Sequence, residues 1–236
     1  MIFMSPQESD FILDKFNSYH NDKRSHTKIW SKRQYAPMYI QCEQLQRLKN
    51  VISTSYPDYT IAFDVIFQSQ GNFVDWHTDH ESLGPFLNNK PFEAICEKHF
   101  LSIHFNLTEN GGSLQTLEWP LISFISHMIN IKTNIFSIYQ KMYSFIIRHI
   151  AYSFARKYNN TKYLGNVFNN VALHCVGEGD VRTSYVIRMI KTSCVMTNKD
   201  CIVKASMRSS DCLEFQKFAE KIDHDNDMLA HELFKL

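Results

Sequence analysis

The segment Phe100–Leu107 alternates two kinds of side chain, and this alternation constrains the fold more than any other stretch of the sequence. One set contains Phe100, Ser102, His104 and Asn106, and the other contains Leu101, Ile103, Phe105 and Leu107. A period of two is that of a β-strand with one face in an apolar core. The residues Glu109-Asn110-Gly111-Gly112 accept positive φ, so they predict a hairpin turn into a partner strand at Ser113–Trp119.

The rest of the chain predicts further short strands between helices. Strands are expected at Ile61–Phe67, Phe73–Asp79, Gly165–His174, Arg182–Lys191 and Ile202–Met207, and helices at Ser5–Tyr19, Gln41–Ser55 and Ser210–Leu236. Ser5 and Glu8 have the spacing of a capping box for the first of these helices. Short strands flanked by helices predict a mainly β fold with a jelly-roll (double-stranded β-helix) core.

The segment 120–164 interrupts this strand pattern. It contains no Gly, Asp or Glu and carries six Lys and Arg residues, and its apolar spacing predicts helices. We interpret it as a helical insertion on the outside of the sheet or over its mouth. The expected organisation is a helical support at 1–60, a jelly-roll core at 61–207 interrupted by this insertion, and a terminal helix at 208–236.

Charge and cysteine usage narrow the class of protein. A net charge of +1 argues against a protein built mainly to bind nucleic acid. The six cysteines include no Cys-x-x-Cys pair, which favours reduced thiols over disulfides or a zinc knuckle. No apolar run reaches the roughly 18 residues of a membrane span, and the first residues do not resemble a signal peptide. We therefore expect a soluble cytoplasmic protein.

Three side chains, distant in sequence, are suited to hold one metal ion. His77 and Asp79 are two residues apart in a predicted strand and share a face, and His174 ends a later strand. Two imidazoles and one carboxylate on one face of an ion suit Fe(II) and leave positions open for a co-substrate and O2. Arg182 and Ser184, which also share a strand face, offer donors for a carboxylate.

In this order the motifs resemble the 2-oxoglutarate/Fe(II)-dependent dioxygenase superfamily, in its prolyl-4-hydroxylase-like branch. The resemblance covers about 61–190 without the insertion. It is carried by the approach to His77-Thr78-Asp79 from Gly71, by Gly111-Gly112, by Leu173-His174-Cys175-Val176 and by Arg182-Thr183-Ser184.

The resemblance implies an oxidoreductase that hydroxylates or otherwise oxidises its substrate and releases succinate and CO2. Fe(II), 2-oxoglutarate and O2 would be required, with ascorbate as an optional reductant. The implied iron ligands are His77, Asp79 and His174, and the implied 2-oxoglutarate anchors are Arg182 and Ser184. Two alternatives stay open: Arg188 shares the strand face of Arg182, and His104 stands where a tyrosine is frequent in the family. Trp76, Phe67 and Phe105 are candidates to line the substrate pocket.

Two functions of other classes also fit the sequence. One is a catalytically inactive jelly roll that serves as a binding module. The other is a zinc-dependent hydrolase that uses His77, Asp79, His80 and His174. The sequence does not select a substrate among small molecules and protein side chains, and it does not determine the oligomeric state.

Overall fold

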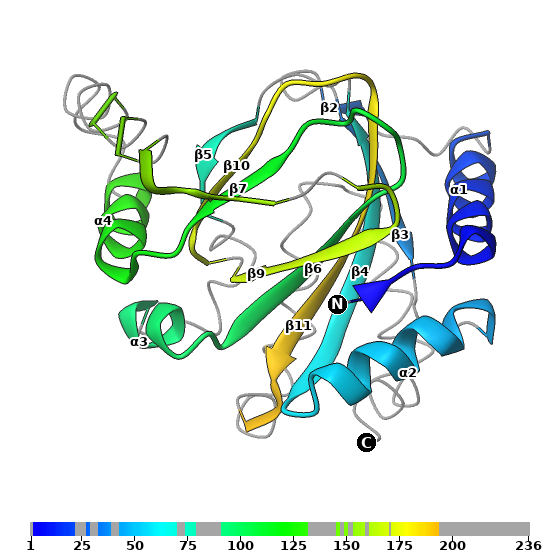
Figure 1. Ribbon diagram of the computed structural model, residues 1–236, viewed down its shortest axis with the longest axis horizontal. Coiled ribbons are helices and arrows are strands. Elements are labelled where there is room, and N and C mark those ends of the chain that lie inside the picture. The colour runs from blue at the N-terminus through cyan, green and yellow to red at the C-terminus, as the bar shows by residue number, and fades with distance from the viewer. Residues whose placement is uncertain are drawn as a thin grey trace.

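The computed structural model describes residues 2–21, 27–28, 33–38, 43–69, 74–78, 91–131, 145–146, 149–150, 153–158, 161–169 and 171–193. In this part of the chain every strand pairing is antiparallel, and the strands form two sheets that face each other (Figure 1). The strand predicted at 202–207 and the helix predicted at 208–236 lie outside the described residues.

Within the described ranges, the larger sheet of the jelly roll has seven strands. Its strands are, in spatial order, β1 (Ile2–Phe3), β9 (Leu164–Asn169), β6 (Phe100–Asn106), β11 (Arg182–Lys191), β4 (Tyr59–Ser69), β3 (Arg33–Met38) and β2 (Thr27–Lys28). The smaller sheet has the order β5 (Val74–His77), β10 (Leu173–Val176), β7 (Leu114–Leu117) and β8 (Arg156–Lys157). The mainly β fold with a jelly-roll core and flanking helices is confirmed.

One face of the larger sheet is apolar and is covered by helices α1 (Pro6–Asn21) and α2 (Gln46–Ser55) (Figure 1). Phe105 and Ile103 of β6 join Tyr185 of β11 in this core, where they meet Ile12 of α1 and Leu48 of α2. The apolar set of the alternating segment is therefore the outer, helix-facing set. Its polar set turns inward, toward the smaller sheet.

The capping box predicted at the start of α1 is present. The backbone N–H of Glu8 donates to Oγ of Ser5 over 3.2 Å, and the N–H of Ser5 donates to the Glu8 carboxylate over 2.7 Å. Pro6 occupies the first helical position, where its missing N–H is not needed. The helix therefore begins at the position that the capping-box spacing predicted.

The predicted hairpin between the strands at 100–107 and 113–119 is wrong. β6 belongs to the larger sheet, whereas β7 belongs to the smaller sheet and pairs with β10 and β8. The turn at 109–112 does contain positive φ values, 56° at Asn110 and 83° at Gly112, but it carries the chain from one sheet to the other. Turn chemistry specifies a reversal of direction and leaves open which strand the next segment pairs with.

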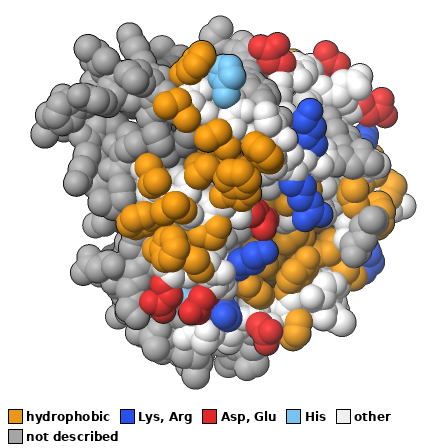
Figure 2. Space-filling model, turned by 60° about the vertical axis from the view of Figure 1, so that its left-hand side comes forward, with side chains coloured by type: hydrophobic (Ala, Val, Ile, Leu, Met, Phe, Trp, Pro, Cys, Tyr) orange, Lys and Arg blue, Asp and Glu red, His pale blue; other side chains and the backbone are white. Residues whose placement is uncertain are grey.

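Among the described elements, one helix covers the outer side of the smaller sheet, and a second, shorter helix packs against it. α3 (Pro91–Cys96) and α4 (Pro120–Ile131) meet through an edge-to-face contact of Phe92 with Phe124, 5.7 Å between centroids. Neither α3 nor strand β3 is among the elements that the sequence predicted. Figure 2 shows hydrophobic side chains gathered on this side, where Leu121 and Ile125 of α4 are exposed. None of the described helices is both long and apolar enough to cross a membrane.

Candidate functional site

The inward face of the larger sheet is lined by polar side chains. Strand register places Ser102 opposite Arg188, and Asn106 opposite Ser184, while His104 lies opposite Val186. Ser102, His104, Asn106 and Ser184 are all buried. Burial of polar side chains destabilises the folded state unless they form hydrogen bonds within the protein or to a polar ligand. The inward face of the larger sheet is therefore suited to bind a polar ligand.

The two histidines predicted as metal ligands come together on the opposite sheet. His77 of β5 and His174 of β10 are register partners, and their rings lie 4.3 Å apart between centroids with an interplanar angle of 53°. His174 is 4% exposed and also contacts the ring of Phe168 in β9, at 5.1 Å. The histidine pair thus faces into the space between the two sheets.

A hydrogen bond fixes the tautomer of His174. Its Nδ1 lies 2.9 Å from the carbonyl oxygen of Ala172. A carbonyl can only accept, so in the neutral form of His174 the proton is on Nδ1, and Nε2 keeps its lone pair. This is the usual arrangement of a metal-binding imidazole, whose second nitrogen donates to a carbonyl or carboxylate.

The donor set fits a divalent metal as far as the structure describes it. Two adjacent imidazoles, one with a defined tautomer, are ordinary ligands of Fe(II) or Zn(II). Asp79 and His80 lie outside the described residues, and no group of three potential ligands occurs among the residues that are described. The proposed third ligand, Asp79, therefore stays a prediction.

Arg182 is held where the two sheets connect. Its side chain is 1% exposed, and Nη1 donates to the carbonyl oxygen of Gly111 over 2.8 Å and to that of Gly177 over 3.3 Å. Two residues along β11, Ser184 is fully buried, and its Oγ has no hydrogen-bond partner among the described residues. A buried hydroxyl of this kind suits a polar ligand that would complete its hydrogen bonding.

The inward face also carries positive charge. Burial, followed by the charges of Arg182, Arg188 and His174, lowers the pKa of His104 to about 3. His104 is therefore neutral at physiological pH, while both arginines remain charged. Arg188 donates from Nη1 to Oγ of Ser102 over 2.7 Å. A face with two guanidinium groups favours an anionic ligand.

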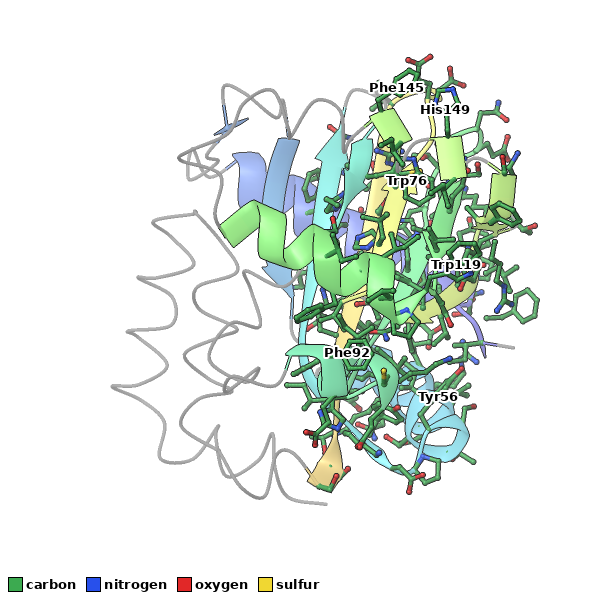
Figure 3. The ribbon with its side chains drawn as sticks, turned by 90° about the vertical axis from the view of Figure 1, so that its left-hand side faces the viewer. Tyr56, Trp76, Phe92, Trp119, Phe145 and His149 are labelled. Atoms are coloured by element: carbon green, nitrogen blue, oxygen red, sulfur yellow. The ribbon has the colours of Figure 1, made fainter. Side chains whose placement is uncertain are left out.

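Two of the three predicted pocket residues lie elsewhere, so these predictions are corrected. Phe105 belongs to the helix-side core and stacks on Tyr185, on the face of β6 opposite to His104. Trp76 packs with Leu117 and Leu173 on the outer side of the smaller sheet, next to α4 (Figure 3). Both misplacements follow from strand alternation, because each residue is next in sequence to a residue of the inward face.

The third pocket candidate, Phe67, is the register partner of Ser184 on β4. The structure does not describe its side chain, so its role stays a prediction. Sequence reasoning missed Phe168, which contacts His174 from the larger sheet, and Ser102, the partner of Arg188. The polar set of the alternating segment already contained Ser102, whereas nothing in the sequence indicated Phe168.

Comparisons with known proteins give no match to a protein-family model and none to a curated protein. Among solved structures, the non-heme alpha ketoglutarate dependent epimerase SnoN from nogalamycin biosynthesis is similar at a TM-score of 0.50 and 9% identity, over 80% of this chain and 76% of that chain. A prolyl-4-hydroxylase from Pseudomonas putida has a TM-score of 0.44 and 10% identity, over 81% of this chain and 90% of that chain. A 2OG-Fe(II) oxygenase family oxidoreductase from Burkholderia pseudomallei has a TM-score of 0.42 and 10% sequence identity, and the match covers 80% of each chain. At these identities the likeness is one of fold.

Proposed function

We propose that this chain, whose fold is that of the 2-oxoglutarate/Fe(II) oxygenases, is a 2-oxoglutarate- and Fe(II)-dependent dioxygenase. The observation that carries the proposal is the pairing of His77 with His174 across β5 and β10, with Nε2 of His174 left as the ligand nitrogen. Asp79, two residues after His77, is proposed as the third ligand. When bound, Fe(II) and 2-oxoglutarate would supply oxidation of the substrate by O2, with release of succinate and CO2.

The larger sheet would bind the co-substrate. Arg182 provides a guanidinium at the end of β11, and the buried hydroxyl of Ser184 provides a further donor on the same strand face. A planar guanidinium and a hydroxyl suit a carboxylate. His104, neutral because of its lowered pKa, can add a hydrogen bond without adding charge. All three side chains are buried, so a carboxylate bound by them would be shielded from water.

The test is succinate production by the purified protein with Fe(II) and 2-oxoglutarate. The substrate panel would contain proline peptides, free amino acids and nucleosides, because the site does not select among them. We expect turnover that requires both Fe(II) and 2-oxoglutarate and that His77→Ala abolishes. Binding of 2-oxoglutarate without turnover on any substrate would favour an inactive binding module. Hydrolysis supported by zinc, with no need for 2-oxoglutarate, would favour the hydrolase.

Binding of 2-oxoglutarate to the Co(II)-loaded protein separates the two candidate anchors. We expect Arg182→Ala to weaken this binding at least tenfold while it preserves Co(II) binding, because Arg182 lies on the other sheet from the histidine pair. Arg188→Ala is the matched substitution on the same strand face. If Arg188→Ala weakens binding and Arg182→Ala does not, Arg188 is the anchor.

A further inference from the structure

One hydrogen bond links helix α4 to the strand that carries His174. The backbone N–H of Leu173 donates to Oγ of Ser123 over 3.1 Å, and Ser123 is fully buried. In Figure 3, α4 crosses in front of the strands of the smaller sheet. Ile122, the neighbour of Ser123, packs against Leu117 and Leu173 on the same outer side. The helix therefore contacts the strand by both packing and a hydrogen bond.

The bond to Ser123 involves the same peptide unit that orients His174. The N–H of Leu173 and the C=O of Ala172 belong to one peptide group, which is planar. Its N–H end is held by Ser123, and its C=O end accepts the Nδ1–H of His174 over 2.9 Å. A continuous chain of hydrogen bonds thus runs from the Ser123 hydroxyl, through one peptide, to the imidazole ring.

The turn before His174 is also fixed from the side of α3. Nδ2 of Asn169 donates to the backbone carbonyl oxygen of Ile95 over 3.0 Å. The backbone carbonyl oxygen of Asn169 accepts the N–H of Ala172, also over 3.0 Å. These bonds locate the chain at 169–172. The next peptide, between Ala172 and Leu173, has two further partners, the hydroxyl of Ser123 and the ring of His174.

We propose that Ser123 is a positioning residue for the metal centre, which it orients through the peptide between Ala172 and Leu173. This inference rests on the function proposed above, because it takes His174 as a ligand. A hydroxyl fixed at the N–H end restrains the plane of the carbonyl and polarises it, so the carbonyl is a better acceptor for Nδ1–H. The imidazole is then held with Nε2 toward the metal. The helix that interrupts the strand pattern thereby acquires a role in the site.

Co(II) binding to the metal-free protein, followed by its visible absorption, tests the proposal independently of turnover. Mutation of the hydrogen-bond partner of a metal-ligating histidine typically lowers metal affinity by about 10- to 100-fold. Ser123 acts one bond further away, so we expect Ser123→Ala to weaken Co(II) binding about tenfold. Ser123→Thr keeps the hydroxyl and should restore most of the affinity.

Ser126→Ala is the matched control, because Ser126 is a buried serine of the same helix and has no hydrogen bond to β10 among the described residues. The melting temperatures of both metal-free alanine variants report general damage to α4. Equal Co(II) affinity of the two variants would overturn the role of Ser123. If Ser123→Ala does not fold, Ser123→Cys, a weaker acceptor of similar size, replaces it, and wild-type affinity of that variant would overturn the role. If the wild-type protein binds no Co(II), the metal centre itself fails, and this inference fails with it.

Discussion

His104 lies on the inward face of β6, and its burial and the charges of Arg182, Arg188 and His174 lower its pKa to about 3. Protonation of this ring would add a cation to a face that already carries two guanidinium groups. In the unfolded chain the same ring has an ordinary pKa near 6.5. The unfolded state therefore takes up this proton at a higher pH than the folded state does.

This difference predicts acid sensitivity. The stability that a neutral His104 contributes is complete above pH 6.5 and is lost as the pH falls toward 3. Between pH 6.5 and 4.5 we expect the free energy of unfolding to fall by about 2 to 3 kcal/mol from this group. Urea unfolding across this range should show a smaller fall in His104→Gln. His149→Gln, at an exposed histidine, should behave like wild type. An unchanged profile in His104→Gln would contradict the assignment.

Gly112 is the residue on which the crossing between the sheets depends. Its φ is 83°, and a Cβ at this position would lie 2.2 Å from the carbonyl oxygen of Gly177 and 3.1 Å from Nη1 of Arg182. We expect Gly112→Ala to cost about 2 kcal/mol or more and also to weaken 2-oxoglutarate binding. At Gly177 an added Cβ would meet only ordinary contacts of 3.6 Å or more, so Gly177→Ala is the control. Equal unfolding midpoints in urea for the two variants would show that the crossing tolerates a side chain.

At the scale of elements, helix α1 is tied to its neighbours through its first turn. Burial tends to raise the pKa of Glu8, but hydrogen bonds from Arg47 and Ser5 outweigh it, so the pKa is lowered. Nε of Arg47 donates to Glu8 over 3.1 Å, and Nη2 of Arg47 donates to the carbonyl oxygen of Phe3 over 3.0 Å. The Glu8 carboxylate therefore caps α1 and joins it to α2 through Arg47, and Arg47 also hydrogen-bonds to the backbone of β1.

Loss of this carboxylate should destabilise the protein without affecting ligand binding, because α1 packs on the helix-facing side of the larger sheet. We expect Glu8→Ala to lower the free energy of unfolding by about 1 to 2 kcal/mol. Gln7→Ala, one residue earlier and exposed, should cost much less. Chemical denaturation measures both. The cost of Glu8→Ala should shrink as the pH falls through the lowered pKa, because a protonated Glu8 no longer pairs with Arg47.

At the scale of the whole molecule, a bound metal ion would link β5 to β10 and, through 2-oxoglutarate, the smaller sheet to the larger one. A ligand at 100 times its Kd stabilises the native state by about 2.7 kcal/mol. For a chain of 236 residues this corresponds to a rise in Tm of about 5 to 10 °C. Differential scanning calorimetry with Co(II) should show the rise in wild type and in His149→Ala, and should not show it in His174→Ala. A rise that survives in His174→Ala would place the ion elsewhere.

Much of the fold could be predicted because it depends on short-range patterns. The alternation at 100–107 identified β6 and both of its faces, and the spacing of Ser5 and Glu8 identified the start of α1. Alternation also placed Arg188 on the face of Arg182. In each case the physical cause acts within a few residues, so it can be read without knowledge of partners.

The pairing of strands and the content of the site were decided by tertiary structure. The turn at 109–112 fits a hairpin, yet the chain crosses to the other sheet, because β7 finds its partners in β10 and β8. Trp76 and Phe105 have the chemistry of pocket residues, but the choice of buried face assigns both to packing. By itself, the sequence indicated the strands β4, β5, β6, β7 and β11 and the side chains that can act chemically, but it missed β3 and joined β9 to β10. Only the packing of the two sheets decided which of them meet, because contacts between distant segments depend on the burial of whole faces and not on local spacing.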